Sequence, residues 1–213
     1  MDLRTRLKRV FLRQLARPSG WFGRWFMARW LENANTVMND LTIERLDLNA
    51  GDRLLEVGFG SGYLLERVLA GGSCAFAAGV ELSEEMKGLG LRRFRRFIEA
   101  GRADILSGEI EHLPFGDAEF TKLCSVNTLY FWRDPAAALA ECRRVLNPGG
   151  RIALCFNAKA ELKAFLGDVS GFTLYELSEV QGMLAGAGFR KIEVALGEEP
   201  KQGLFYCVTG LAA

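Results

Sequence analysis

The chain has 213 residues, of which 49% are apolar and 25% are charged, and this balance is typical of a globular protein. Its net charge of +1 indicates no particular class of partner, and its single histidine, His112, excludes a metal site built from several histidines. The five cysteines contain no C-x-x-C pair, which predicts reduced thiols in a cytoplasmic protein, without a structural metal.

The first 30 residues are strongly basic, with eight Lys and Arg residues against Asp2. Apolar residues recur at helical spacing over 3–16, Pro18-Ser19-Gly20 interrupts the pattern, and a second helical segment is predicted over 21–46. We expect residues 1–48 to form a helical arm before a domain over 49–213. Three roles remain open for this arm: packing on the domain, covering the acceptor pocket, or peripheral contact of residues 1–30 with an anionic membrane.

Strand and helix patterns alternate through the rest of the chain. Helices are predicted over 63–70, 84–100, 135–146 and 177–186. Strands are predicted over 53–57, 74–80, 103–106, 123–126, 151–156, 191–196 and 204–209. The alternation predicts a parallel sheet covered on both faces, and the short link between the last two strands predicts an antiparallel hairpin. The fold class is therefore α/β, with a seven-stranded mixed sheet of six parallel strands and one antiparallel strand.

A glycine-rich turn, GFGSG at 58–62, follows the first predicted strand. Ligands of open parallel sheets bind where strands end and helices begin, and glycine lets the backbone approach them closely. A dinucleotide loop would place its third glycine at position 63, where this chain has Tyr63. Glu56 precedes the first glycine by two residues and favours a cationic ligand over a pyrophosphate.

An acidic residue, Glu81, ends the second predicted strand about 20 residues beyond the turn, where a ribose-binding acid belongs in such folds. Its two oxygens can accept hydrogen bonds from both ribose hydroxyls. The alternative is an exposed charge at a strand end. Ser83 is a suitable N-cap for the helix that follows.

Further motifs follow in order: GEIEHLPF at 108–115, SVNTLYFWRDP at 125–135 and VLNPGG at 145–150. Together with the turn and Glu81, they resemble the class I S-adenosylmethionine (SAM)-dependent methyltransferases, in the group that includes the ubiquinone/menaquinone-biosynthesis methyltransferases. The resemblance covers roughly residues 50–157. It implies a Rossmann-like fold, SAM as the cofactor with S-adenosylhomocysteine (SAH) as product, and in-line methyl transfer to a small-molecule or lipid acceptor.

The resemblance also implies a role for each matching position. The methionine end of SAM would be held by Glu56 and by the backbone of three glycines, Gly58, Gly60 and Gly62. Glu81 would bind the ribose, with Leu82 against the adenine. Glu109 would accept from the adenine amino group, the Ile110 N–H would meet a ring nitrogen, and Asn127 would lie near the sulfonium and the acceptor.

An oxygen or carbon acceptor would also need a general base. His112 and Tyr130 are the candidates, the alternatives being an exposed loop residue for His112 and packing at the sheet edge for Tyr130. The segment after the fourth strand, NTLY at 127–130, lacks the prolines of a D/N-P-P-Y loop. This argues against methylation of nucleobase amines, and we expect no nucleic-acid partner.

Two other functions remain open at this point. One is an NAD-dependent oxidoreductase, against which Tyr63 and Glu56 count. The other is a non-catalytic nucleoside-binding module that acts through protein partners. The acceptor, the oligomeric state and the pathway are not indicated by the sequence.

Overall fold

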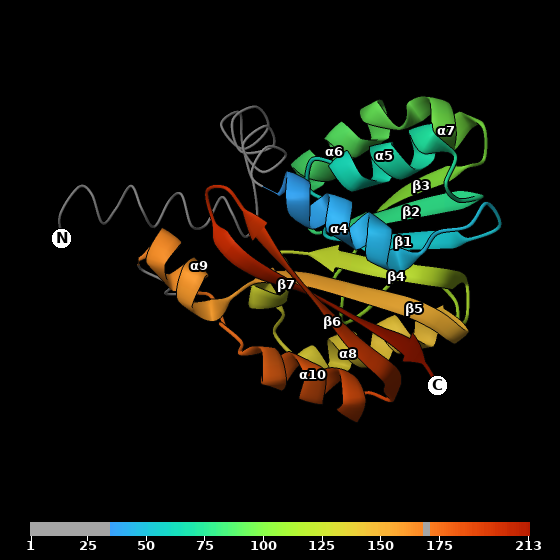
Figure 1. Ribbon diagram of the computed structural model, residues 1–213. Helices are drawn as coiled ribbons and strands as arrows, with labels where there is room; N and C mark the ends of the chain where they lie inside the picture. The colour runs from blue at the N-terminus through green and yellow to red at the C-terminus, as the bar shows by residue number, and fades with distance from the viewer. Residues whose placement is uncertain (1–34, 168–170) are drawn as a thin grey trace.

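The computed structural model describes residues 35–167 and 171–213 and shows a twisted sheet between two layers of helices (Figure 1). Within these residues the sheet has seven strands in the order β3-β2-β1-β4-β5-β7-β6. Their bounds are β1 (Arg53–Val57), β2 (Phe76–Glu81), β3 (Ala103–Ser107), β4 (Phe120–Val126), β5 (Leu146–Asn157), β6 (Phe189–Glu199) and β7 (Gly203–Ala212).

Strand direction follows from the length of the connections. Strands β1 to β5 pair in parallel because a helical crossover separates most of them, whereas β7 pairs antiparallel with both β5 and β6. The link from β6 to β7 is a tight turn at 200–202, too short for a crossover. The predicted mixed sheet of six parallel strands and one antiparallel strand is therefore confirmed.

Helices cover both faces of the sheet. They are α4 (Thr36–Leu46), α5 (Tyr63–Gly71), α6 (Glu84–Arg93), α7 (Arg95–Glu99), α8 (Pro135–Val145), α9 (Lys159–Leu166), α10 (Leu177–Gly186) and the 3₁₀ turn η2 (Leu129–Phe131). One apolar cluster joins the sheet to α4, α5 and the α6–α7 region, and a second joins the opposite face to α8 and α10. The central strands β1, β2 and β4 are thus buried on both faces, as a parallel sheet requires, whereas the edge strand β6 is largely exposed.

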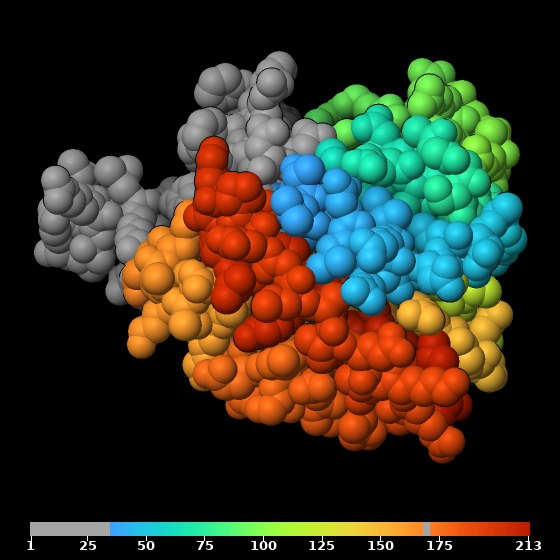
Figure 2. Space-filling model, viewed as in Figure 1, coloured from blue at the N-terminus to red at the C-terminus, as the bar shows by residue number. Residues whose placement is uncertain are grey.

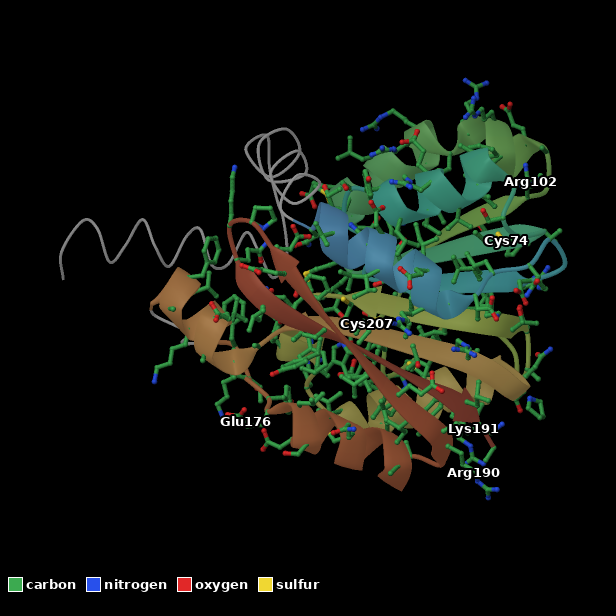
Figure 3. The ribbon with its side chains drawn as sticks, viewed as in Figure 1. Cys74, Arg102, Glu176, Arg190, Lys191 and Cys207 are labelled. Carbon is green, nitrogen blue, oxygen red and sulfur yellow. The ribbon has the colours of Figure 1, made fainter. Side chains whose placement is uncertain are left out.

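Helix α4 is the part of the predicted arm that lies within the described residues. It packs across β4, β5, β6 and β7 and beside α5. In the space-filling view its surface is continuous with that of the β6–β7 hairpin (Figure 2). Buried Cys207 lies midway along β7 (Figure 3), directly opposite Cys155 of β5, and all five cysteines are free thiols.

The elements differ from the predictions in three places. The helix predicted over 84–100 is two helices, because Phe94 leaves the helical conformation and turns its ring into the core. The turn predicted at 147–150 lies within β5, which starts at Leu146. Helix α9 occupies a segment for which the sequence predicted no element.

The helix predicted over 3–16 and the expected membrane contact through residues 1–30 lie outside the described residues. In the described part of the chain, no helix combines the length and the apolar character needed to cross a bilayer. The boundary between arm and domain at residue 48 stays a prediction.

Candidate functional site

A cavity of about 180 Å³ lies at the carboxyl ends of β1, β2 and β4. The chain runs outward from β1 to β2 and β3 and then crosses back to β4 on the other side of β1, so the cavity sits where the strand order reverses. Its described lining includes most of the predicted cofactor positions, namely Glu56, Gly58, Gly60, Glu81, Leu82, Glu109, Ile110 and Asn127.

The glycine turn needs its glycines for two different reasons. Gly58, Gly60 and Gly62 all have positive φ, of 74°, 52° and 80°, which costs other residues strain. A Cβ at Gly58 would overlap the Thr128 side chain, and a Cβ at Gly62 would lie 2.6 Å from Cζ of Phe94. Gly62 is not among the lining residues, so the structure gives it a packing role beneath the turn.

Glu56 is a buried carboxylate at the end of β1, with 3% of its surface exposed. Among the described residues, its Oε2 has no hydrogen-bond partner. The pKa of Glu56 is raised to about 8, mainly by burial and to a smaller extent by nearby Glu81, while a hydrogen bond from the Leu65 backbone opposes the shift. An unpaired buried carboxylate is costly, and a bound cation offsets that cost.

Glu81 closes the cavity on the β2 side. Its Oε2 accepts from the Gly60 N–H at 3.0 Å, and its Oε1 accepts from the N–H groups of Leu82 at 2.9 Å and Ser83 at 3.0 Å. Burial raises the pKa of Glu81, and these three hydrogen bonds counter it. Because a carboxylate offers about four acceptor positions, one remains for a ligand hydroxyl.

The rim of the cavity carries an ion pair. The Arg133 guanidinium lies 3.4 Å from Glu109, and the backbone N–H of Arg133 donates to Glu111 at 2.9 Å. Both partners of the ion pair are substantially exposed, so it contributes little to stability. Ile110 is buried and Leu82 is 38% exposed, and both apolar side chains line the cavity.

Asn127 follows β4 in a left-handed conformation, with φ of 56°. Its Nδ2 donates to Asn35 Oδ1 at 3.0 Å and contacts Met38 Sδ at 3.2 Å, both in the α4 region. Its Oδ1 accepts from the Tyr130 hydroxyl at 3.0 Å. The amide is thus held in one orientation at the cavity wall.

The two candidate bases lie outside the cavity lining. His112 is exposed in the turn after β3, where its N–H donates to the Glu109 carbonyl. Tyr130 is buried, its hydroxyl accepts from the Asn157 N–H at 2.5 Å, and burial raises its pKa further above the range in which a phenol gives up its proton. Neither placement suits proton abstraction from a molecule in the cavity.

Several lining residues were not singled out from the sequence. They are Asn35 and Asn39 near the start of α4, together with Glu111 and Arg133. The signal for the asparagines was their four-residue spacing within a predicted helix, which places both on one face. In the described residues, no group of His, Cys, Asp and Glu side chains is arranged to hold a metal ion.

Comparison with known proteins finds similarity to methyltransferases. Residues 55–154 match the family described as "Methyltransferase domain". The chain is 29% identical over 175 residues to the methyltransferase YdaC of Bacillus subtilis, covering 82% of this chain and 91% of that protein. It is 34% identical over 137 residues to the ubiquinone biosynthesis O-methyltransferase of Aromatoleum aromaticum, covering 61% of this chain and 57% of that one.

A solved structure agrees with these matches at the level of the fold. The SAM-dependent methyltransferase of Aquifex aeolicus superposes with a TM-score of 0.68 at 18% identity, covering 88% of this chain and 97% of that one. These findings favour a methyltransferase over the NAD-dependent oxidoreductase that the glycine turn alone left open. Residues 55–154 of the chain therefore match a methyltransferase domain, and the sheet has the fold of the SAM-dependent methyltransferases.

Proposed function

We propose that this chain binds SAM in the cavity and transfers its methyl group to a small-molecule or lipid acceptor. The main support for this proposal is the buried carboxyl group of Glu56. Its Oε2 is buried and unpaired beside a glycine turn, at the strand end where this fold binds its ligand. The ammonium group of SAM is a hydrogen-bond donor and a cation, so it can supply both the hydrogen bond and the positive charge that this oxygen lacks.

The other residues of the cavity fit the remaining parts of SAM. Gly58 and Gly60 leave room for the methionine chain, because neither carries a Cβ into the turn. Glu81 would take a ribose hydroxyl on its remaining acceptor position. The adenine would lie between Leu82 and Ile110, with its amino group toward Glu109.

SAM, when bound, supplies a methyl group already activated by its positive sulfonium. The protein's residues have to hold the cofactor and the acceptor in line and keep water out. Asn127 would help to align the cofactor and the acceptor where the two ligands meet, since its amide faces the cavity and is fixed by Asn35 and Tyr130. We therefore propose that Tyr130 positions Asn127 and does not accept a proton.

Calorimetric titration with SAM and SAH tests the cofactor. Wild type and a control variant, Glu99→Gln on the exposed side of α7, should bind both compounds, and Glu56→Gln should bind SAM at least about tenfold more weakly. No binding of either compound by the wild type would refute the proposal. Incubation of source-cell extract with SAM carrying a deuterated methyl group, followed by mass spectrometry, then identifies the acceptor.

A further inference from the structure

The two sides of the cavity differ in chemistry. Strands β1 and β2 and the turn after β3 contribute carboxylates, whereas α4 and residues 127–128 after β4 contribute neutral carboxamides and a hydroxyl. Since the carboxylate side fits SAM, the carboxamide side is left for the acceptor. We infer that Asn39 of α4 is a specificity-determining residue for the acceptor, and that this acceptor is an uncharged molecule with a hydroxyl or carbonyl group. This inference rests on the proposed function.

Asn39 has an unused hydrogen-bonding side chain. It lines the cavity, only 7% of its surface is exposed, and its carboxamide has no hydrogen bond to the described residues. The Asn39 amide is not one of the fully buried polar groups that lack a partner, so it opens to the cavity and is available to bond a ligand there. An amide both donates and accepts, as a hydroxyl or carbonyl partner requires.

The residues around Asn39 hold this wall in place. One turn earlier on the same face of α4, Asn35 accepts from Asn127 at 3.0 Å and from Gln202 Nε2 at 3.2 Å. Glu199, at the end of β6, accepts from the Met38 N–H at 2.9 Å. The helix start is therefore tied to β4 and to the β6–β7 turn, which fixes the direction of the Asn39 side chain.

A second unpaired amide lies behind the same wall. Asn157 ends β5, is 1% exposed, and neither its Oδ1 nor its Nδ2 has a hydrogen-bond partner. Its backbone N–H donates to the Tyr130 hydroxyl, which in turn holds Asn127. The amides of Asn39 and Asn157 thus both lie at this end of the sheet, on the same side as Asn127, the amide proposed to lie near the sulfonium.

The charges of the cavity favour an uncharged acceptor. Four carboxylates line it, those of Glu56, Glu81, Glu109 and Glu111. Arg133 is the one cation among the described lining residues, and it is paired with Glu109. A phosphate or carboxylate on the acceptor would meet repulsion, and the described residues of the carboxamide side offer it no free cation.

The test separates source-cell extract by ion exchange into anionic, neutral and cationic pools before each is incubated with the protein and deuterated-methyl SAM. We expect labelled product from the neutral pool. Asn39→Leu, which has a similar volume, should lower its formation by at least about tenfold while SAM affinity stays within about threefold. Its melting temperature should change little, because the substitution removes no side-chain hydrogen bond to the described residues.

Asn147→Leu is the matched control, since Asn147 Oδ1 is also buried and unpaired but lies at the opposite end of β5. It should leave methyl transfer unchanged, and Asn39→Ala repeats the test with a smaller side chain. Three results would overturn the inference and leave the proposed function intact. They are labelled product from the anionic or cationic pool, full activity of both Asn39 variants, and a tenfold loss of SAM affinity in these variants. A wild type that binds SAM but labels no pool would refute the methyl transfer itself.

Discussion

The hydroxyl of Tyr130 joins the ends of two neighbouring strands: it donates to Asn127 Oδ1 at 3.0 Å after β4 and accepts from the Asn157 N–H at 2.5 Å on β5. Both hydrogen-bonding functions of the phenol are used within the fold. This arrangement distinguishes a positioning residue from a base, because a base must be free to take a proton from a ligand.

Tyr130→Phe should therefore destabilise the protein by about 1–3 kcal/mol, since it leaves the buried Asn157 N–H unpaired and frees the Asn127 amide. Methyl transfer should fall, while the pH profile of the remaining activity keeps its shape. Urea denaturation and a pH–rate profile measure the two effects. Loss of the increase in rate with rising pH would instead identify the phenol as the base.

Glu56 should make stability depend on pH. Its pKa is about 8 in the fold, against 4.5 in the unfolded chain, so the folded state binds the extra proton between these values. The stabilising effect of that proton is complete below about pH 4.5 and is lost as the pH rises through about 8. At about 1.4 kcal/mol per pKa unit, the loss reaches up to about 5 kcal/mol. Glu56→Gln should show a smaller fall in the free energy of unfolding over this range by urea denaturation.

The same carboxyl group should couple SAM binding to proton release. At neutral pH most of Glu56 is protonated, and the SAM ammonium requires the carboxylate, so SAM affinity should rise with pH up to about 8. Calorimetry in buffers of different ionisation enthalpy should give different binding heats for the wild type and equal heats for Glu56→Gln. Buffer-independent heats in the wild type would show that the ammonium does not meet Glu56.

Gly62→Ala should be more damaging than an alanine at another glycine of the same backbone conformation. The new methyl group would meet the Phe94 ring in addition to the strain of a φ of 80°. Gly72→Ala is the control, with a φ of 65° and nothing within 4 Å, and it should cost about 1–2 kcal/mol. Thermal unfolding of both variants gives the comparison, and equal melting temperatures would show that the Phe94 contact yields easily.

Glu109 and His112 lie three residues apart but should behave differently. Glu109→Ala should weaken SAM binding by about tenfold, because it removes the expected partner of the adenine amino group. His112→Ala should leave SAM binding and methyl transfer unchanged, because the ring is exposed and lies outside the cavity lining. A large loss of turnover in His112→Ala with normal SAM binding would restore it as a candidate base.

The order of the elements could be predicted from the sequence because their patterns are local. Strand 53–57 and helix 177–186 have the predicted bounds, and the short link before β7 gave the direction of that strand. The break at Phe94 could not be predicted, because it depends on the distant Gly62, which leaves room for the ring.

The candidate site was predictable only where one motif carried the chemistry. Glu56, Glu81 and Glu109 line the cavity as expected, whereas Asn35 and Asn39 face it only because α4 is held by Glu199 and Gln202 from the last hairpin. Tyr130 illustrates the same limit, since its burial depends on the end of β5. The positions of Asn35, Asn39 and Tyr130 depend on contacts between segments that are distant in the sequence, and a local sequence pattern does not predict such contacts.

The position of β7 in the sheet has a consequence for how the chain assembles. Strand β6 precedes β7 in the chain, yet it reaches the rest of the sheet only through β7. During synthesis, β6 therefore emerges without its hydrogen-bonding neighbour, and the Glu199 contact that fixes the start of α4 has to wait for the same late pairing. The cofactor end of the molecule should consequently be completed among the last steps of folding, although its glycine turn is made early.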